Sequence, residues 1–136
     1  MDSVNNHYKA PEMRLLFVCG RSRLRSPTAE QLFSRVPSVE TCSAGVNPDA
    51  DQPLTADLIQ WADMVFVMEA AHRAKMARRF ARALRGKRVV CLNIPDHYEY
   101  MAPELVRLLW ERVPRSAPGL AGFRPAEHPE GEKGTA

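Results

Sequence analysis

The chain has 136 residues, a length that favours a single domain, and 45% of them are hydrophobic, which is enough to form one core. No run of about 18 apolar residues occurs, so no membrane span and no membrane partner are predicted. The three cysteines form no Cys-x-x-Cys pair, and no His-x-x-x-His pattern occurs, which argues against a metal site and a disulfide framework. We therefore expect reduced thiols and a cytoplasmic protein without metal or cofactor.

Strand and helix patterns alternate along the chain. Residues 1–12 are polar, lack the apolar stretch of a signal peptide and are predicted to be a flexible leader. The patterns then predict, in chain order, a strand at 13–18, a helix at 26–36, a strand at 39–43, a helix at 55–62 capped by Thr55, a strand at 64–68, a helix from 69 or 70 to 84, a strand at 88–92 and a helix at 103–113. Because Pro, Gly and charged residues dominate afterwards, residues 114–136 are predicted to be a disordered tail. The alternation predicts one α/β domain, residues 13–113, with a four-stranded parallel sheet and helices on both faces.

The segment between the first strand and the first helix carries the most informative pattern. The apolar strand runs into Cys19, and Arg25 follows after five residues: Gly20, Arg21, Ser22, Arg23 and Leu24. A helix start is then predicted, with Ser26 as its N-cap and Pro27 as its first residue. A loop that leads from a strand into a helix N-terminus binds anions through its backbone N–H groups. We name residues 20–24 the cradle loop and predict that they and Ser26 bind an oxyanion.

A cysteine at the base of such a cradle can act as a nucleophile. The thiolate is the reactive form, and both a helix N-terminus and nearby cations favour it. Arg25 stays charged at any working pH, and its planar fork can hold two oxygens of a phosphoryl group in line with the Cys19 sulfur. Attack by the sulfur, to which Ser26 can donate a hydrogen bond, would form a cysteinyl-phosphate. Taken alone, Cys19 is more typical of a small buried residue, but the whole pattern favours chemistry.

These residues resemble the low-molecular-weight protein tyrosine phosphatases, which carry Cys-x5-Arg-Ser-Pro directly after the first strand. Four residues match that motif in order: Cys19, Arg25, Ser26 and Pro27. Three later segments show weaker similarity to the family, at residues 43–45, 63–68 and 94–98. The resemblance covers residues 13–112 and implies a cysteine-dependent phosphatase without a cofactor. It implies that the substrates are phosphorylated proteins, phosphotyrosine above all, or small aryl phosphates. It also implies inorganic phosphate or sulfate as a ligand of the cradle loop.

The resemblance assigns the role of general acid to Asp96, because the family has such an Asp in a loop late in the chain. Chemistry also requires an acid, since a phenolate leaves poorly unless its oxygen is protonated. Cys19 ends the first strand and Asp96 follows the fourth, so we expect both at the carboxyl edge of the sheet. Alternatively, Asp96 only starts a turn, and Asp49 or Asp51 is the acid. Tyr98 matches a family position whose aromatic ring lines the substrate cleft. A packing role for Tyr98 in the core is an equally good interpretation.

Three departures from the family pattern affect the same site. Ser22 stands where most members have Asn, which tolerates a left-handed backbone better than Ser does. Leu24 stands where many members have a second cysteine, so the protective disulfide with Cys19 cannot form. The segment at 46–62 is shorter than in typical members, which changes one wall of the substrate cleft. The natural substrate therefore does not follow from the family.

The predicted helix at 70–84 is strongly basic. Eight Lys and Arg residues and no acidic residue occur between His72 and Arg88. Met76, Phe80 and Leu84 recur with a helical period and give the helix a core-facing side. A solvated helix face is the simpler interpretation of the charges, and a surface for an acidic phosphoprotein is the alternative. A nucleic-acid partner is not expected, and His72 is interpreted as an exposed helix residue rather than a catalytic base.

Two other functions compete with the phosphatase. A non-catalytic module that binds phosphate or phosphoproteins would need the cradle loop but no acid. Arsenate reduction uses the same kind of loop in related enzymes, and it would need Cys42 and Cys91 to approach Cys19. Both of these cysteines fall in or beside predicted strands, where buried thiols are normally inert.

Overall fold

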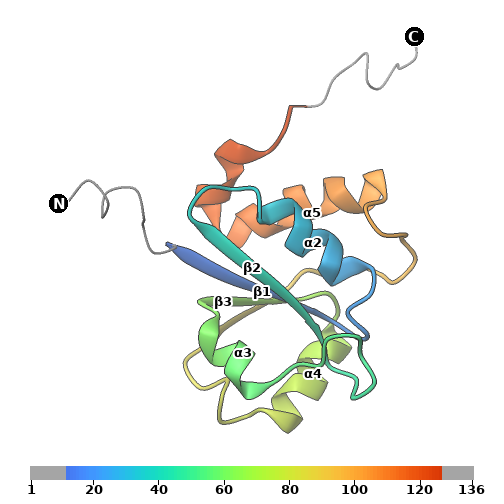
Figure 1. Ribbon diagram of the computed structural model, residues 1–136, viewed down its shortest axis with the longest axis vertical. Helices are drawn as coiled ribbons and strands as arrows, with labels where there is room; N and C mark the ends of the chain where they lie inside the picture. The colour runs from blue at the N-terminus through green and yellow to red at the C-terminus, as the bar shows by residue number, and fades with distance from the viewer. Residues whose placement is uncertain (1–11, 127–136) are drawn as a thin grey trace, which may run out of the picture.

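Four short apolar segments form the strands of one parallel sheet (Figure 1). They are β1 (Met13–Cys19), β2 (Val39–Gly45), β3 (Met64–Val67) and β4 (Arg88–Cys91). The computed structural model describes residues 12–126, and the strand order in the sheet is β2-β1-β3-β4. Since β1 pairs with both β2 and β3, it lies inside the sheet, and its residues from Leu15 to Val18 are completely buried.

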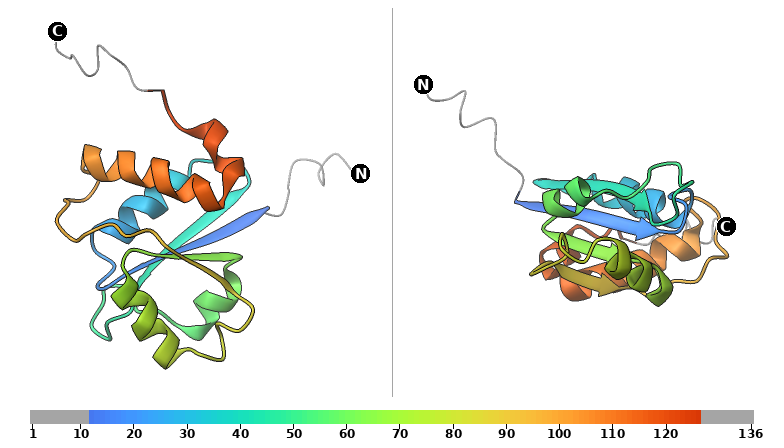
Figure 2. Two further views of the ribbon diagram at one scale, coloured as in Figure 1. Left: turned by 180° about the vertical axis from the view of Figure 1, so that it is seen from behind. Right: turned by 90° about the horizontal axis from the view of Figure 1, so that it is seen from below.

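Two helices cover each face of the sheet (Figures 1 and 2). On one face lie α2 (Arg25–Phe33) and α5 (Pro103–Ser116), followed by the short helix η1 (Pro118–Phe123). On the other face lie α3 (Ala56–Trp61) and α4 (Ala70–Arg79). None of the helices within residues 12–126 has the length and apolar character needed to span a bilayer. The predicted α/β fold is therefore confirmed.

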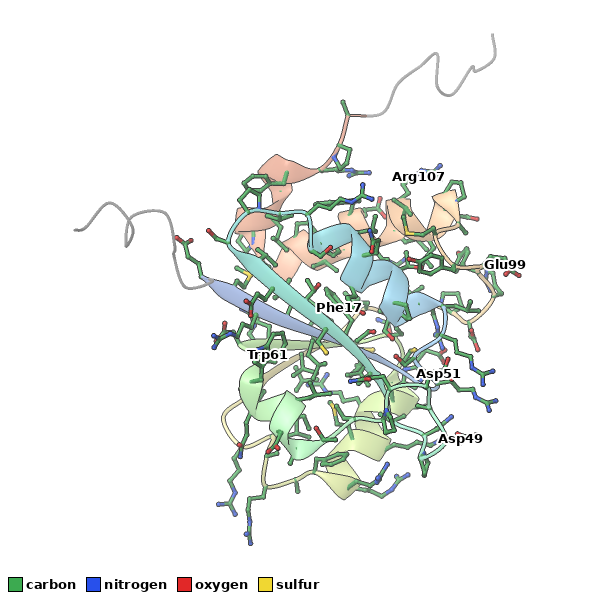
Figure 3. The ribbon with its side chains drawn as sticks, viewed as in Figure 1. Phe17, Asp49, Asp51, Trp61, Glu99 and Arg107 are labelled. Carbon is green, nitrogen blue, oxygen red and sulfur yellow. The ribbon has the colours of Figure 1, made fainter. Side chains whose placement is uncertain are left out.

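The alternation of side chains along β1 divides the core into two clusters. Leu15, Phe17 and Cys19 face α2 and α5, whereas Leu16 and Val18 face α3 and α4. The ring of Phe17, labelled in Figure 3, stacks against those of Phe33 and Phe66, with centroid distances of 5.7 and 5.4 Å. Burying one such ring stabilises the fold by roughly 1.5–3 kcal/mol. The position of Cys19 is therefore set by a strand that is packed on both faces.

Several helix boundaries differ from the predictions, and α2 ends at Phe33 rather than at residue 36. The helix α2 begins at Arg25, so Ser26 is not its N-cap. The helix α4 ends at Arg79 rather than at residue 84, because Phe80 leaves the helical conformation and the chain turns back toward β4. Gly86 adopts a φ of 70° in this turn, a conformation that suits glycine. Thr55 caps α3 as predicted, since its side chain accepts a hydrogen bond from the Leu58 N–H.

The prediction of a disordered tail from residue 114 is wrong for residues 114–126. The helix α5 continues through Pro114 to Ser116, and η1 follows it directly. Ala117 and Leu120 are buried in the cluster formed with α2 and α5. The composition of this segment, rich in Pro and Gly, indicated disorder. The burial of Ala117 and Leu120 in the core holds the segment in place. The rest of the predicted tail and residues 1–11 of the predicted leader lie outside the described residues.

Candidate active site

The carboxyl edge of the sheet holds a cavity of ≈ 430 Å³. Three chain segments that are far apart in sequence meet there: the end of β1 with the cradle loop, the start of α4, and the loop after β4. The lining residues are Cys19, Gly20, Arg21, Arg23, Leu24, Arg25, Asn47, Glu69, Ala71, His72, Lys75 and Asp96. The structure thus brings Cys19, Arg25 and Asp96 together, as expected for one edge of a parallel sheet.

The Cys19 sulfur has two hydrogen-bond partners, the Ser22 N–H, which donates to it, and the Ser26 hydroxyl. The backbone N–H of Ser22 lies 3.2 Å from Sγ, and the hydroxyl of Ser26 lies 3.0 Å from it. Cys19 is buried, and Ser26 is completely buried beneath it. The Ser22 N–H and the Ser26 hydroxyl are therefore placed to interact with the sulfur when it acts as nucleophile and as leaving group. The hydroxyl of Ser26, predicted to cap the helix, is used at the sulfur instead, while Leu24 is the N-cap without a side-chain bond.

The backbone of Ser22 is left-handed, with a φ of 59°. Asn adopts this conformation more readily than Ser, which pays about 1–2 kcal/mol for it. The conformation aims the Ser22 N–H at the Cys19 sulfur, and the residue is buried. The strained backbone of the cradle loop therefore occurs at the residue whose N–H donates to the Cys19 sulfur.

Arg25 is buried, and one of its nitrogens, Nη1, is held by two partners. Its Nη1 donates to the Glu69 carboxylate and to the Ile94 carbonyl, the latter at 2.7 Å. Its Nε lies 3.7 Å from the Asp96 carboxylate, too far for a hydrogen bond. Among the residues that the structure describes, no hydrogen bond involves Nη2. One side of the guanidinium is thus anchored, and the other is available to an oxyanion in the cavity.

The segment after β2 braces the cradle loop from outside. The N–H groups of Val46, Asn47 and Asp51 donate to the carbonyls of Cys19, Gly20 and Arg21 at 2.9, 3.0 and 3.0 Å, respectively. Gly45 permits this close approach, because a Cβ there would lie 2.5 Å from the Gly20 oxygen. The short segment that departs from the family pattern therefore supports the loop directly.

Two exposed ion pairs join the same segments. Arg21 pairs with Asp49 at 2.9 Å, and Arg23 pairs with Asp51 at 3.3 Å. Figure 3 shows Asp49 and Asp51 beyond the carboxyl end of β2. Neither carboxylate lines the cavity, whereas Asp96 does, so Asp49 and Asp51 are weaker candidates for the acid.

Glu69 and His72 line the cavity, although the sequence analysis did not select them. The interpretation of His72 as an exposed residue is wrong, since only 8% of it is exposed. The two side chains form a capping box at the start of α4, in which the Glu69 N–H donates to Nδ1 of His72 at 3.2 Å. The spacing Glu-x-x-His three residues apart was a usable signal for this box. The same Glu69 holds Arg25, so the box positions the arginine.

The protonation of His72 links stability to pH. Burial first, and then the charges of Arg25 and Lys75, lower the pKa of His72 below its ordinary value, against opposing effects of Glu69 and Asp96. The unfolded chain therefore takes up a proton at higher pH than the folded chain does. As the pH falls below the ordinary histidine pKa, about 6.5, the folded state is expected to lose stability until His72 itself is protonated.

Replacing His72 by Gln is expected to remove part of this pH dependence, because the Gln oxygen can accept the same hydrogen bond but does not titrate. Urea unfolding between about pH 5 and pH 7.5 measures it. The variant His97→Gln, at an exposed position, is the matched control and should keep the wild-type slope. Equal slopes for wild type and His72→Gln would contradict the assignment.

The remaining candidates lie away from the cavity. Tyr98 is half-buried against the cluster of α2 and α5 and does not line the cavity, which favours its packing alternative. Cys42 and Cys91 pack on the opposite face of the sheet, with α3 and α4. Burial, with a smaller effect of Glu30, raises the pKa of the Cys42 thiol, so this thiol is a poor nucleophile. Within residues 12–126, no cluster of side chains suited to a metal ion occurs.

Solved structures of phosphatases share this fold. The tyrosine phosphatase Wzb from Escherichia coli K30, in complex with phosphate, is 27% identical with a TM-score of 0.64, over 79% of this chain and 97% of that one. The YwlE arginine phosphatase from Geobacillus stearothermophilus is 22% identical with a TM-score of 0.61, over 85% and 99% of the two chains. A low-molecular-weight protein tyrosine phosphatase from Bacillus subtilis is 26% identical with a TM-score of 0.59, over 83% and 100%. No family model and no curated protein matches the chain.

These similarities confirm the resemblance to low-molecular-weight phosphatases, with a fold that is shared over most of the chain. They also agree with the prediction of a cysteine-dependent phosphatase, since the similar structures are enzymes of that kind. The identity to these three structures is between 22% and 27%.

Proposed function

We propose that this chain is a phosphatase that hydrolyses phosphomonoesters, phosphotyrosine in proteins among them, through a cysteinyl-phosphate at Cys19. The observation that carries the proposal is the Cys19 sulfur, hydrogen-bonded to the Ser22 N–H and the Ser26 hydroxyl, in one cavity with the buried Arg25, whose Nη1 is held by the Ile94 carbonyl. The three cysteines, all unpaired, fit a reducing compartment, and we propose a cytoplasmic location.

In the first step, the cradle loop N–H groups and Arg25 hold the phosphoryl oxygens. The Cys19 sulfur attacks phosphorus, a sulfur–phosphorus bond forms, and the phosphorus–oxygen bond to the leaving group breaks. Asp96, at the mouth of the cavity, gives its proton to the departing oxygen. The increase in negative charge on the transferring group faces the guanidinium of Arg25.

In the second step, the Asp96 carboxylate takes a proton from water as that water attacks the phosphorus. The sulfur–phosphorus bond breaks, phosphate leaves, and the electron pair returns to the Cys19 sulfur. The hydrogen bonds from Ser22 and Ser26 then stabilise the thiolate as a leaving group. No further cysteine and no cofactor takes part.

Two similar proteins support parts of this proposal. The Escherichia coli K30 Wzb was solved in complexes with phosphate and with sulphate, which fits a cradle loop that binds inorganic phosphate or sulfate. A YwlE arginine phosphatase was solved as a cysteine-to-serine mutant with a phosphorylated active-site serine. That state fits phosphoryl transfer to the corresponding position, which we assign to Cys19. Arsenate reduction is less well supported, because Cys42 and Cys91 lie on the opposite face of the sheet.

The role of Asp96 predicts a loss of rate that depends on the leaving group. Asp96→Asn should reduce the kcat/KM for phenyl phosphate, which reports on the steps up to the departure of the phenolate, by about 10²–10⁴-fold, because a poor leaving group needs its proton. The loss should be much smaller for 2,4-dinitrophenyl phosphate, whose phenolate leaves unprotonated. Steady-state hydrolysis of both compounds measures the difference.

Asp51→Asn is the matched control, because Asp51 is exposed, paired with Arg23, and outside the cavity lining. It should leave the ratio of the two rates unchanged. If Asp51→Asn rather than Asp96→Asn shows the dependence on the leaving group, the acid is misassigned. If the wild type binds phosphate but hydrolyses neither compound, the chain is a binding module instead.

A further inference from the structure

We propose that this phosphatase, if the function above holds, selects phosphorylated protein segments with acidic residues beside the phosphorylated residue. The surface that recognises them is one row of the helix α4, comprising Lys75 and Arg78, which leads away from the mouth of the cavity. We name it the α4 row. Three features of the mouth support this inference: its lack of Phe, Tyr and Trp side chains within the described residues, its charge balance and the geometry of the helix.

The mouth offers no Phe, Tyr or Trp ring for a substrate to stack on. None of the cavity's lining residues within the described part of the chain is of these types, and the imidazole of His72, which does line the cavity, belongs to a residue that is only 8% exposed. Tyr98 packs on the core instead, and Trp61 lies on α3, toward the other end of the sheet from Asp49 and Asp51 (Figure 3). Stacking therefore contributes little to substrate binding beyond the phosphoryl group, and polar contacts must supply the selectivity.

The charges at the mouth leave one cation without an acidic partner. Arg21 and Arg23 are paired with carboxylates of the segment after β2, and Arg25 with Glu69. Lys75 also lines the cavity, but within residues 12–126 its hydrogen bond goes to the neutral amide oxygen of Asn47, at 3.1 Å. Its charge is therefore available to an anionic group on the substrate.

Helix geometry extends this positive charge away from the mouth. Successive residues of a helix are rotated by about 100°, so Lys75 and Arg78 lie within about 40° of Ala71, which lines the cavity. Arg78 is exposed, and no acidic residue occurs between Glu69 and Asp96 in the sequence. Arg73 is rotated by about 200° from Ala71 and points to another side. The α4 row thus forms a basic track that begins at the phosphoryl site.

An acidic peptide fits this track better than other polyanions do. Lys75, where the track starts, lines the same cavity as Cys19, so a phosphorylated residue at the sulfur and its acidic neighbours along the track can bind together. A nucleic acid would also be attracted by α4, and the experiment separates the two.

The test compares two phosphopeptides that differ only in their flanking residues, acidic in one and neutral in the other. For the wild type at low salt, kcat/KM should be about 3- to 10-fold higher for the acidic peptide, and the ratio should shrink as salt is added. Arg78→Glu should bring this ratio of kcat/KM values to about one. It should do so by lowering kcat/KM for the acidic peptide, while kcat/KM for the neutral peptide stays unchanged. Arg73→Glu changes the same charge on the other side of the same helix and should keep the ratio.

A ratio near one in the wild type, or equal effects of Arg78→Glu and Arg73→Glu, would overturn the inference. Hydrolysis of the acidic phosphopeptide can also be inhibited with competitors. If a single-stranded oligonucleotide inhibits at lower concentration than an unphosphorylated acidic peptide does, the inference is overturned and the α4 row binds nucleic acid instead. Hydrolysis of phenyl phosphate by the wild type reports separately on the proposed function. If the wild type does not hydrolyse phenyl phosphate, the proposed phosphatase function is wrong. If it does, and the ratio for the two peptides is near one, only the proposed selectivity is wrong.

Discussion

Replacing Cys19 by serine is expected to reduce the turnover of an aryl phosphate by a factor on the order of 10³ or more, because the nucleophile acts as a unit with its donors. A serine hydroxyl keeps the shape of the site, but it is a far weaker nucleophile and a poor leaving group in the second step. The fold should survive, since the side chain is small and its polar neighbours, Ser22 and Ser26, can bond to oxygen as well. The kcat for phenyl phosphate and the urea midpoint measure the two effects.

Cys42→Ser is the matched control for this variant. Cys42 lies on β2 on the opposite face of the sheet, and its thiol bonds only to the Ser43 carbonyl within the described residues. This variant should retain turnover within a few-fold of the wild type. Equal activity of wild type and Cys19→Ser would mean that another group attacks the phosphorus.

Replacing Arg25 by lysine is expected to reduce kcat/KM by about 10²–10³-fold, the usual effect of removing one donor from a charged transition state. Lysine keeps the charge but has no planar fork, so it cannot hold Glu69 and the Ile94 carbonyl while it also binds two phosphoryl oxygens. Part of the network around Glu69 loses its partner, which should lower the free energy of unfolding by about 1–3 kcal/mol. Steady-state kinetics and urea unfolding measure both.

Arg112→Lys separates these two consequences. Arg112 on α5 donates to the Leu92 and Asn93 carbonyls at 2.9 and 2.7 Å, but it does not line the cavity at Cys19. The variant should lower stability to a comparable extent and leave kcat/KM nearly unchanged. If both lysine variants lose activity in proportion to their stability, Arg25 has only a structural role.

The sequence predicted the elements whose signals are local and strong. The apolar run that forms β1 predicted a buried central strand, and the alternation of elements predicted the parallel sheet and its shared carboxyl edge. From that edge, the meeting of Cys19, Arg25 and Asp96 followed without coordinates. The left-handed backbone inferred at Ser22 from the family pattern is also present.

The features that the sequence did not predict depend on tertiary contacts. Ser26 looked like a cap, but the sulfur at the end of β1 competes for its hydroxyl. His72 looked like one more polar residue of a basic helix, but it is buried at the cavity and accepts a hydrogen bond from the Glu69 N–H. Pro114 looked like the start of a tail, but the contacts of Leu120 with the core hold the chain. In each case a distant partner outweighs the local pattern.

The most direct test of the central claim is to trap the intermediate. The wild-type protein is mixed with phenyl phosphate and quenched with denaturant during turnover, and its peptides are analysed by mass spectrometry. The account predicts one phosphoryl group on the peptide that contains Cys19, with Cys42 and Cys91 unmodified as internal controls. A phosphoryl group on another residue, or hydrolysis that continues in Cys19→Ser, would contradict it.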